Sequence, residues 1–284
     1  MTWPLDAFQA WRCHPRIILE RPQVSIETQK IRVEPGDGYA VVFLANPPMN
    51  VVSTQLTREL YAALKELELD TAVRAVIVTG AGDKAFCAGS DITELEHMTA
   101  PGAVLEKKLI FQNKVFELLR AFPKPTIAAL NGVTYGGGLE IAACCDMIVA
   151  EKQVRLCLPE IKLGVFPSSG GTFRVARKIG DARAKEMIFL GEPIDANQAH
   201  TWGLVNRVVE TGQALAEARE IAQRLAGRPR LAMQMAKSII NLAFDRSDAE
   251  AIAESLKASD RVFCSDDAKE GVAAFLAKRP AVFG

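Results

Sequence analysis

Two glutamates lie in a glycine-rich part of the chain, and their surroundings suit acid–base chemistry. Glu140 ends the run Gly-Gly-Gly-Leu-Glu at 136–140, and Glu160 follows in Leu-Pro-Glu at 158–160, just before a second glycine-rich turn at 167–171. A run of glycines leaves backbone N–H groups uncovered, so it can hold an oxyanion or a phosphate. Two carboxylates around such a place could add or remove a proton next to a carbonyl.

A second loop of small residues, Lys-Ala-Phe-Cys-Ala-Gly-Ser-Asp at 84–91, follows a strand-like segment. Ligands of open α/β sheets bind at the carboxyl ends of strands. One N–H from this loop and one from the glycine run could converge on a carbonyl oxygen, each worth about 3 kcal/mol to a transition state. Taken singly, each loop has a plainer interpretation: Asp91 could cap the next helix, and the glycines could form a tight turn. The glycine run matches neither a dinucleotide fingerprint nor a Walker A loop.

The elements that must position these loops alternate between strands and helices. Apolar runs predict strands at 39–44, 74–79, 124–130 and 147–150, and helical spacing predicts helices at 53–68, at 103–119 and from 138. This alternation predicts an α/β fold with largely parallel strands. The rest of the chain, from 172, is mostly helical in pattern. We expect an N-terminal arm over 1–24, a core with the site over 25–210, and a helical C-terminal region over 211–284.

Charge and composition argue against several classes of partner. Lys plus Arg and Asp plus Glu are both 34, so nothing favours binding of nucleic acid. The six cysteines form no C-x-x-C pair, which predicts reduced thiols and no metal site. Neither an apolar leader nor a stretch of 18 apolar residues is present, so we expect a soluble cytoplasmic protein without membrane contact.

At this level of detail the chain resembles the crotonase (enoyl-CoA hydratase/isomerase) superfamily, and within it enoyl-CoA hydratase most closely. Residues 74–91 resemble the first signature of the family and residues 124–171 the second, and the likeness extends to 203–209 and 270–279. It therefore covers roughly residues 25–284. The resemblance implies a crotonase-like spiral of β-β-α turns with a helical C-terminal region, assembled as a homotrimer or homohexamer.

The resemblance also implies a role for each candidate residue. The N–H groups of Ser90 and Gly137 would form an oxyanion hole for a thioester carbonyl. Glu140 would hold and deprotonate water, and Glu160 would deliver a proton to C2, so that water adds reversibly to the 2,3 double bond of an acyl-CoA. Coenzyme A would enter as part of the substrate, with no metal or redox cofactor. Serine at 90 replaces the alanine common in hydratases but keeps the N–H. Implied contacts to the substrate or its CoA are Lys84, Ala88, Asp91, Ile92, Gly136 and, toward a neighbouring subunit, Phe275 and Lys278.

Two other functions remain open at this point. Isomerases of the family move a double bond with one carboxylate near the position of Glu160, and the presence of Glu140 favours hydration instead. A non-catalytic protein that kept the fold to bind RNA or another subunit is the second alternative, against which the neutral charge and both glutamates argue. Lys84 also fits a solvated loop lysine, and Phe275 an ordinary amphipathic helix. The length and shape of the acyl group are left open.

Overall fold

A seven-stranded sheet forms the centre of the protein, in the order β1-β2-β3-β4-β6-β8-β11. The structure is a computed structural model that describes residues 26–284, so the predicted arm over 1–24 lies outside the described residues. The first three strands pair antiparallel, and every later neighbour from β3 onward pairs parallel, as the alternating pattern predicted. The strands are β1 (Ile26–Glu27), β2 (Ile31–Pro35), β3 (Tyr39–Leu44), β4 (Ala75–Gly80), β6 (Thr126–Leu130), β8 (Met147–Glu151) and β11 (Arg207–Val209).

A second sheet of four short strands, in the order β10-β9-β7-β5, was not predicted from the residues themselves. Each of β4, β6 and β8 is followed by one strand of this second sheet and then by a helical segment. The chain therefore winds in β-β-α turns, which confirms the spiral that the family resemblance implied. The strands are β5 (Ala85–Cys87), β7 (Val133–Tyr135), β9 (Arg155–Cys157) and β10 (Ile194–Asp195), and the helical segments after β5, β7 and β9 are α2 (Ile92–Leu95), α4 (Gly137–Cys144) and η2 (Glu160–Leu163).

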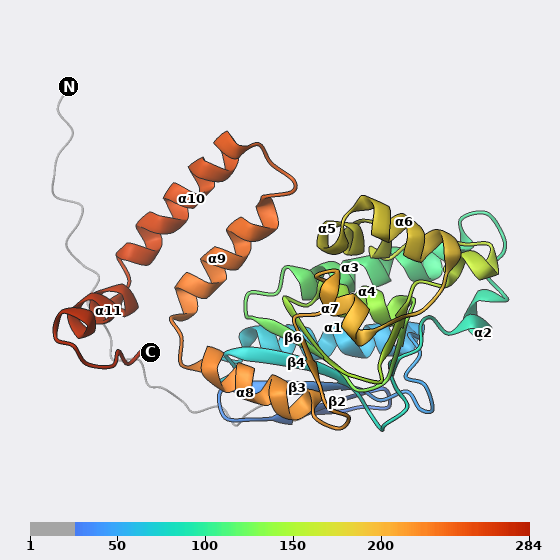
Figure 1. Cartoon of the computed structure of the whole chain (residues 1–284), viewed down its shortest axis with the longest axis horizontal. Helices are drawn as coiled ribbons and strands as arrows, with labels where there is room; N and C mark the ends of the chain where they lie inside the picture. The colour runs from blue at the N-terminus through green and yellow to red at the C-terminus, as the bar shows by residue number, and fades with distance from the viewer. Residues whose placement is uncertain (1–25) are drawn as a thin grey trace.

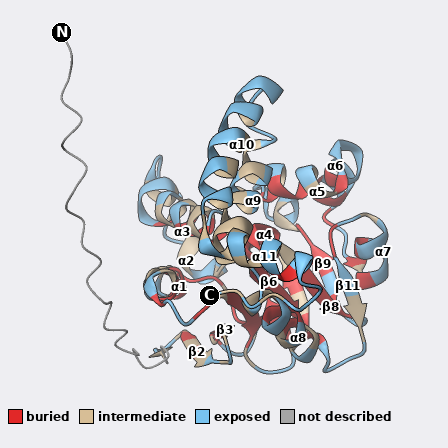
Figure 2. Cartoon of the chain, turned by 90° about the vertical axis from the view of Figure 1, so that its left-hand side faces the viewer, coloured by how far each residue is buried: buried red, intermediate tan, exposed pale blue. Residues whose placement is uncertain are grey.

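The central sheet is covered on both faces, because successive residues of a strand point to opposite sides. In β3, Val41 packs in the core under α8 (Ala214–Ala226), whereas Val42 packs in the larger core under α1 (Thr54–Leu69). Figure 1 shows α8 on one side of the sheet and α1 and α3 (Ile110–Arg120) on the other, and Figure 2 shows the strands between them as buried. Helix α1 begins at the predicted cap, since Ser53 Oγ accepts a hydrogen bond from Leu56 N–H.

The predicted C-terminal region over 211–284 consists of two structurally different parts. Helix α8 packs on the sheet, and Ala214, Ala218 and Ala222 are fully buried there. Helices α10 and α11 stand away from this body (Figure 1), whereas α9 contacts it through Lys237, whose Nζ lies 2.8 Å from Asp146 Oδ2. Within residues 26–284 no helix has the length and apolar character needed to cross a membrane. The remaining helical segments are η1 (Leu105–Leu109), α3 (Ile110–Arg120), η3 (Gly171–Val175), α5 (Ala176–Ile179), α6 (Asp181–Leu190), α7 (Ala196–Thr201), α9 (Arg230–Leu242), α10 (Asp248–Phe263) and α11 (Asp266–Leu276).

Candidate active site

The loops that follow β5 and β7 meet at one edge of the second sheet. These two strands are parallel neighbours, so their carboxyl ends lie at the same edge. A Cβ added to Gly137 would lie 3.7 Å from Ser90 N, and one added to Gly136 would lie 3.5 Å from the Cα of Gly89. A Cβ added to Gly138 would come within 2.1 Å of Cys87 O, so α4 can approach β5 this closely only with glycine there. The structure thus places Ser90 beside Gly137.

The backbone N–H groups of Ser90 and Gly137 are both available to a ligand. No hydrogen bond within residues 26–284 uses either of them. Gly137 is the first residue of α4, and the N–H groups of a first helical turn have no partner inside the helix. Gly136 precedes it with a φ of 47°, a conformation that favours glycine and starts the helix at this point. The positive end of the helix dipole adds to the attraction for a developing negative charge.

Glu140 is the fourth residue of α4 and is only 3 % exposed. Its Oε1 accepts hydrogen bonds from the backbone N–H groups of Ser169, at 2.8 Å, and Gly171, at 2.9 Å. Burial raises the pKa of Glu140 above its ordinary value, and these two donors oppose that rise. The carboxylate is therefore held in one orientation through Oε1, while Oε2 accepts no hydrogen bond from the described residues.

Glu160 begins η2, directly after Pro159, and approaches the same glycine loop. A Cβ added to Gly136 would lie 3.0 Å from Glu160 Oε1. Burial raises the pKa of Glu160 to about 7, its own backbone N–H opposes the rise, and the charge of Glu140 adds to it. Its Oε2 is buried without a hydrogen-bond partner among the described residues. A buried carboxylate atom without a partner is unusual and points to a ligand that completes the site.

A cavity of about 800 Å³ borders both glutamates and Ser90. Two other cavities, of about 430 and 740 Å³, border neither glutamate. The large cavity is thus bordered by two carboxylates and by Ser90, beside which Gly137 lies, and this part of it could stabilise an oxyanion and transfer protons. In the part of the chain that the structure describes, no three His, Cys, Asp or Glu side chains gather as a metal site would require. Most of the remaining wall is apolar, which suits an acyl chain, and includes Ile92, Leu95, Leu105, Leu109, Val165 and Phe166.

The other residues predicted to contact substrate fall into two groups. Ala88, Ile92 and Gly136 border the large cavity, whereas Lys84 is exposed and does not. Asp91 caps α2, because its Oδ1 accepts a hydrogen bond from Thr93 N–H at 3.1 Å, as the plainer interpretation of this residue predicted. Phe275, which is 82 % exposed, lies in α11, and Lys278 follows this helix. Neither residue borders the cavity. A contact from them to a neighbouring subunit stays a prediction.

Several residues of the site were not predicted. The turn at 167–171 supplies the N–H groups that hold Glu140, a role that its glycines alone did not indicate. Lys108 and Gln112 also border the cavity, as buried polar side chains of η1 and α3. The spacing contained a signal for them, because they lie at helical intervals before Val115 and so share its buried side.

Comparison with known proteins agrees with this fold and site. Residues 34–284 match the family model described as enoyl-CoA hydratase/isomerase. The short-chain-enoyl-CoA hydratase of Clostridium acetobutylicum is 38 % identical over 256 residues, covering 89 % of this chain and 97 % of that protein. The crotonyl-CoA hydratase of Syntrophomonas wolfei is 36 % identical over 256 residues, covering 90 % and 98 %. The crystal structure of an enoyl-CoA hydratase from Bacillus anthracis superposes with a TM-score of 0.85 at 33 % identity, covering 90 % of this chain and 99 % of that one.

Proposed function

The chain belongs to the enoyl-CoA hydratase/isomerase family, and we propose that it is an enoyl-CoA hydratase, a hydro-lyase of acyl-CoA metabolism. The observation that carries the proposal is that Glu140 and Glu160 border one cavity next to the N–H groups of Ser90 and Gly137. The reaction is the reversible addition of water to the 2,3 double bond of an acyl-CoA thioester. Isomerisation would not require a second carboxylate at the position of Glu140.

In this mechanism the thioester oxygen lies between the N–H groups of Ser90 and Gly137. Glu140 removes a proton from water, the water oxygen bonds to C3, and the electron pair of the double bond moves toward the thioester oxygen. The two N–H donors stabilise the resulting enolate-like charge. Glu160 then gives its proton to C2, which restores the carbonyl. Addition of water forms the C3–O and C2–H bonds in place of the π bond with no net oxidation or reduction, and Glu140 and Glu160 regain their starting states by proton exchange with solvent. We therefore propose that coenzyme A takes part only as a portion of the substrate and that no metal or redox cofactor is used.

The environments of the two carboxylates support this division of roles. The backbone N–H groups of Ser169 and Gly171 stabilise the ionised form of Glu140, which a base for water must have. Glu160 has no such donors from other residues, and its pKa of about 7 keeps much of it protonated near neutral pH. Two carboxyl groups whose surroundings differ in this way can act as base and acid at the same pH.

The first test is hydration of crotonyl-CoA, chosen because one of the similar proteins carries that name. We expect the absorbance of the conjugated thioester to fall as the 3-hydroxy product forms. A 3-enoyl-CoA serves as the matched substrate, since an isomerase would raise the same absorbance by conjugating the double bond. Conversion of the 3-enoyl-CoA without hydration of crotonyl-CoA would identify an isomerase, and turnover of neither would favour the non-catalytic alternative.

The pH dependence of hydration should show the titration of Glu160. Above a pH of about 7 Glu160 loses the proton that C2 must receive, so kcat/KM should fall about tenfold per pH unit. We would measure kcat/KM for crotonyl-CoA between about pH 5 and about pH 9, on both sides of the pKa of Glu160. The residual activity of Glu160→Gln should lack this alkaline limb. An unchanged limb in that variant would assign the titration to another group.

We also propose that the chain forms a homotrimer or homohexamer through α9–α11. Helix α10 exposes large apolar side chains, with Leu256 66 % and Phe263 76 % exposed, and Figure 2 shows this helix as largely exposed. Apolar surface of this kind marks association sites. Light scattering should give three or six times 30.9 kDa, and Phe263→Glu should lower the mass. The matched control is Leu69→Glu, which changes a 72 % exposed leucine on α1. A wild-type mass of one chain at micromolar concentration would contradict the proposal.

The cysteines support a reducing location. Cys87, Cys144, Cys145 and Cys157 are buried as free thiols, and Cys264 is an exposed free thiol. Exposed free thiols are typical of compartments that keep cysteine reduced. We therefore propose that the enzyme works in the cytoplasm.

A further inference from the structure

Lys108 is a buried cation next to the proposed active site. It lies on η1, and its side chain is only 2 % exposed. Its Nζ donates hydrogen bonds to Val52 O, at 3.0 Å, and to Glu94 Oε2, at 2.7 Å. A charge buried to this extent is costly unless it is paired and hydrogen-bonded. The adjacent Lys107 is exposed to solvent, so burial is particular to Lys108 and is not a property of every lysine in this segment.

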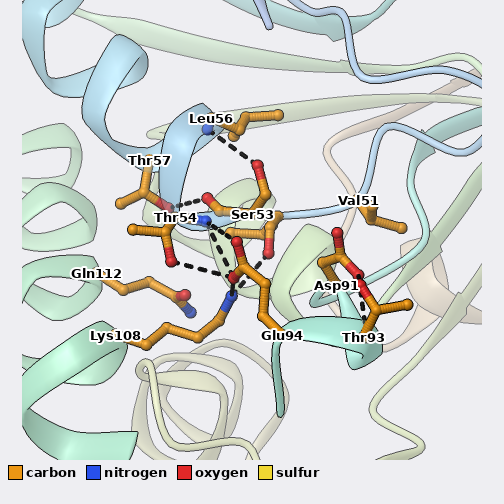
Figure 3. A network of polar contacts seen from close by, with 12 residues as sticks. Val51, Ser53, Thr54, Leu56, Thr57, Asp91, Thr93, Glu94, Lys108 and Gln112 are labelled. Carbon is orange, nitrogen blue, oxygen red and sulfur yellow. Dashed lines mark hydrogen bonds and ion pairs between the residues drawn. The ribbon is translucent and has the colours of Figure 1, made fainter. Parts of the chain in front are cut away.

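Glu94 connects this cation to the start of α1. Its carboxylate accepts hydrogen bonds from Thr54 N–H, at 2.9 and 3.1 Å, and from Thr54 Oγ1, at 3.1 Å. Thr54 is the first residue of α1, where a carboxylate also interacts well with the helix dipole. Figure 3 shows Lys108 and Thr54 approaching the carboxylate of Glu94 from different elements. The pair therefore fastens α2 and η1 to the beginning of α1.

The second acceptor of Lys108 belongs to the backbone that holds Ser90. Val52 and Ser90 form a parallel β-bridge. Val52 N–H donates to Gly89 O at 2.7 Å, and Val52 O accepts from Asp91 N–H at 3.0 Å. The residues on both sides of Ser90 are thus bonded to Val52, and the direction of the Ser90 N–H depends on where Val52 lies. Val52 also lies beside Gly137, since a Cβ added to Gly137 would be 3.3 Å from Val52 Cγ2.

We propose that Lys108, together with Glu94, is a positioning residue that sets the Ser90 half of the oxyanion hole through Val52 O. The inference rests on the proposed hydratase function. Lys108 fixes the carbonyl of Val52, the bridge from Val52 fixes Gly89 and Asp91, and the N–H of Ser90 is thereby aimed at the thioester oxygen. Lys108 itself transfers no proton and need not touch the substrate.

The kinetic test compares Lys108→Met with Lys107→Met. Methionine keeps most of the apolar stem but makes no hydrogen bond to Val52 O and leaves Glu94 without its cation. We expect kcat for crotonyl-CoA hydration to fall about 10- to 10²-fold, because small misplacements of a catalytic group have effects of this size. KM should change less than about threefold, since the apolar wall that holds the acyl chain remains. Lys107→Met removes a lysine from the same segment and should match the wild type.

A spectroscopic readout separates positioning of the hole from general damage. A conjugated dienoyl-CoA that is bound but hydrated slowly should absorb at longer wavelength when two N–H donors polarise its carbonyl. The wild type and Lys107→Met should show this red shift in full, and Lys108→Met should show a smaller shift at saturating ligand. Glu94→Gln provides a second variant if Lys108→Met does not fold. It keeps an acceptor for Thr54 and for Lys108 but loses the charge, and we expect a smaller loss of both kcat and red shift.

The outcomes distinguish the two levels of the proposal. A full red shift and wild-type kcat in Lys108→Met, or in Glu94→Gln if only that variant folds, would overturn the positioning role while leaving the hydratase function intact. A wild-type protein that neither hydrates crotonyl-CoA nor shifts the dienoyl spectrum would overturn the proposed function, and the positioning role with it. A reduced shift with nearly unchanged KM supports the positioning role.

Discussion

Glutamine at either catalytic position should reduce kcat for crotonyl-CoA hydration by about 10²- to 10⁴-fold, the usual contribution of a positioned general acid or base. The substitution removes the titrating group and little else. In Glu140→Gln the amide oxygen can still accept the hydrogen bonds from Ser169 and Gly171 N–H that hold Oε1 in the wild type. Binding of the substrate should therefore change much less than kcat.

The two variants should differ in a partial reaction. Removal of a proton from C2 of a saturated acyl-CoA needs Glu160 and the oxyanion hole but no activated water. Exchange of that proton with deuterated solvent, followed by nuclear magnetic resonance, should persist in Glu140→Gln and be lost in Glu160→Gln. Glu151→Gln is the control, since Glu151 is 4 % exposed but does not border the large cavity. Hydration at the wild-type rate in Glu140→Gln would rule out the two-carboxylate mechanism.

Removal of the Ser90 N–H should have the second-largest effect. Proline at 90 has no N–H, and loss of one oxyanion-hole donor lowers kcat by about 10²- to 10³-fold. No hydrogen bond within the described residues uses this N–H, so its loss breaks no contact of the resting protein. Ser90→Ala keeps the N–H and removes only the hydroxyl, and it should retain nearly wild-type kcat.

Comparison of the two Ser90 variants isolates the backbone donor from the side chain. Kinetics with crotonyl-CoA give kcat and KM for each, and thermal unfolding checks that both are folded. A large loss in Ser90→Ala would show that the hydroxyl, and not the N–H, carries the effect. Equal activity of Ser90→Pro and wild type would remove Ser90 from the oxyanion hole.

The fold was predictable in its long elements and less so in its short ones. The strand at 39–44 and the helix from 53 were clear because apolar runs, leucine spacing and the Ser53 cap all agreed. The three-residue strands β5 and β7 were not, because they are too short to show an alternating pattern and lie in loops rich in small residues. Their pairing brings Ser90 and Gly137 together. The residues alone indicated that the two loops could converge, but the particular N–H groups came from the family resemblance.

Helical spacing could place Lys108 on a buried side, but the hydrogen-bond partners of the supporting residues depend on tertiary contacts that spacing does not reveal. Lys108 is separated from Val52 by 56 positions and from Glu94 by 14. Its burial follows from where η1 packs, and a lysine in an amphipathic segment ordinarily faces solvent. The anchoring of Glu140 likewise uses N–H groups of residues 169 and 171, and backbone donors leave no mark in a sequence.

The most direct test of the central claim is to follow the source of the new oxygen. Wild-type protein is incubated with crotonyl-CoA in heavy-oxygen water, and the acyl-CoA products are analysed by mass spectrometry. If Glu140 activates water for attack at C3, the product is a 3-hydroxyacyl-CoA that carries one heavy oxygen on C3, and Glu140→Gln forms it far more slowly. Failure to form any 3-hydroxyacyl-CoA, or a shifted double bond without added oxygen, would contradict hydration by the Glu140 and Glu160 pair.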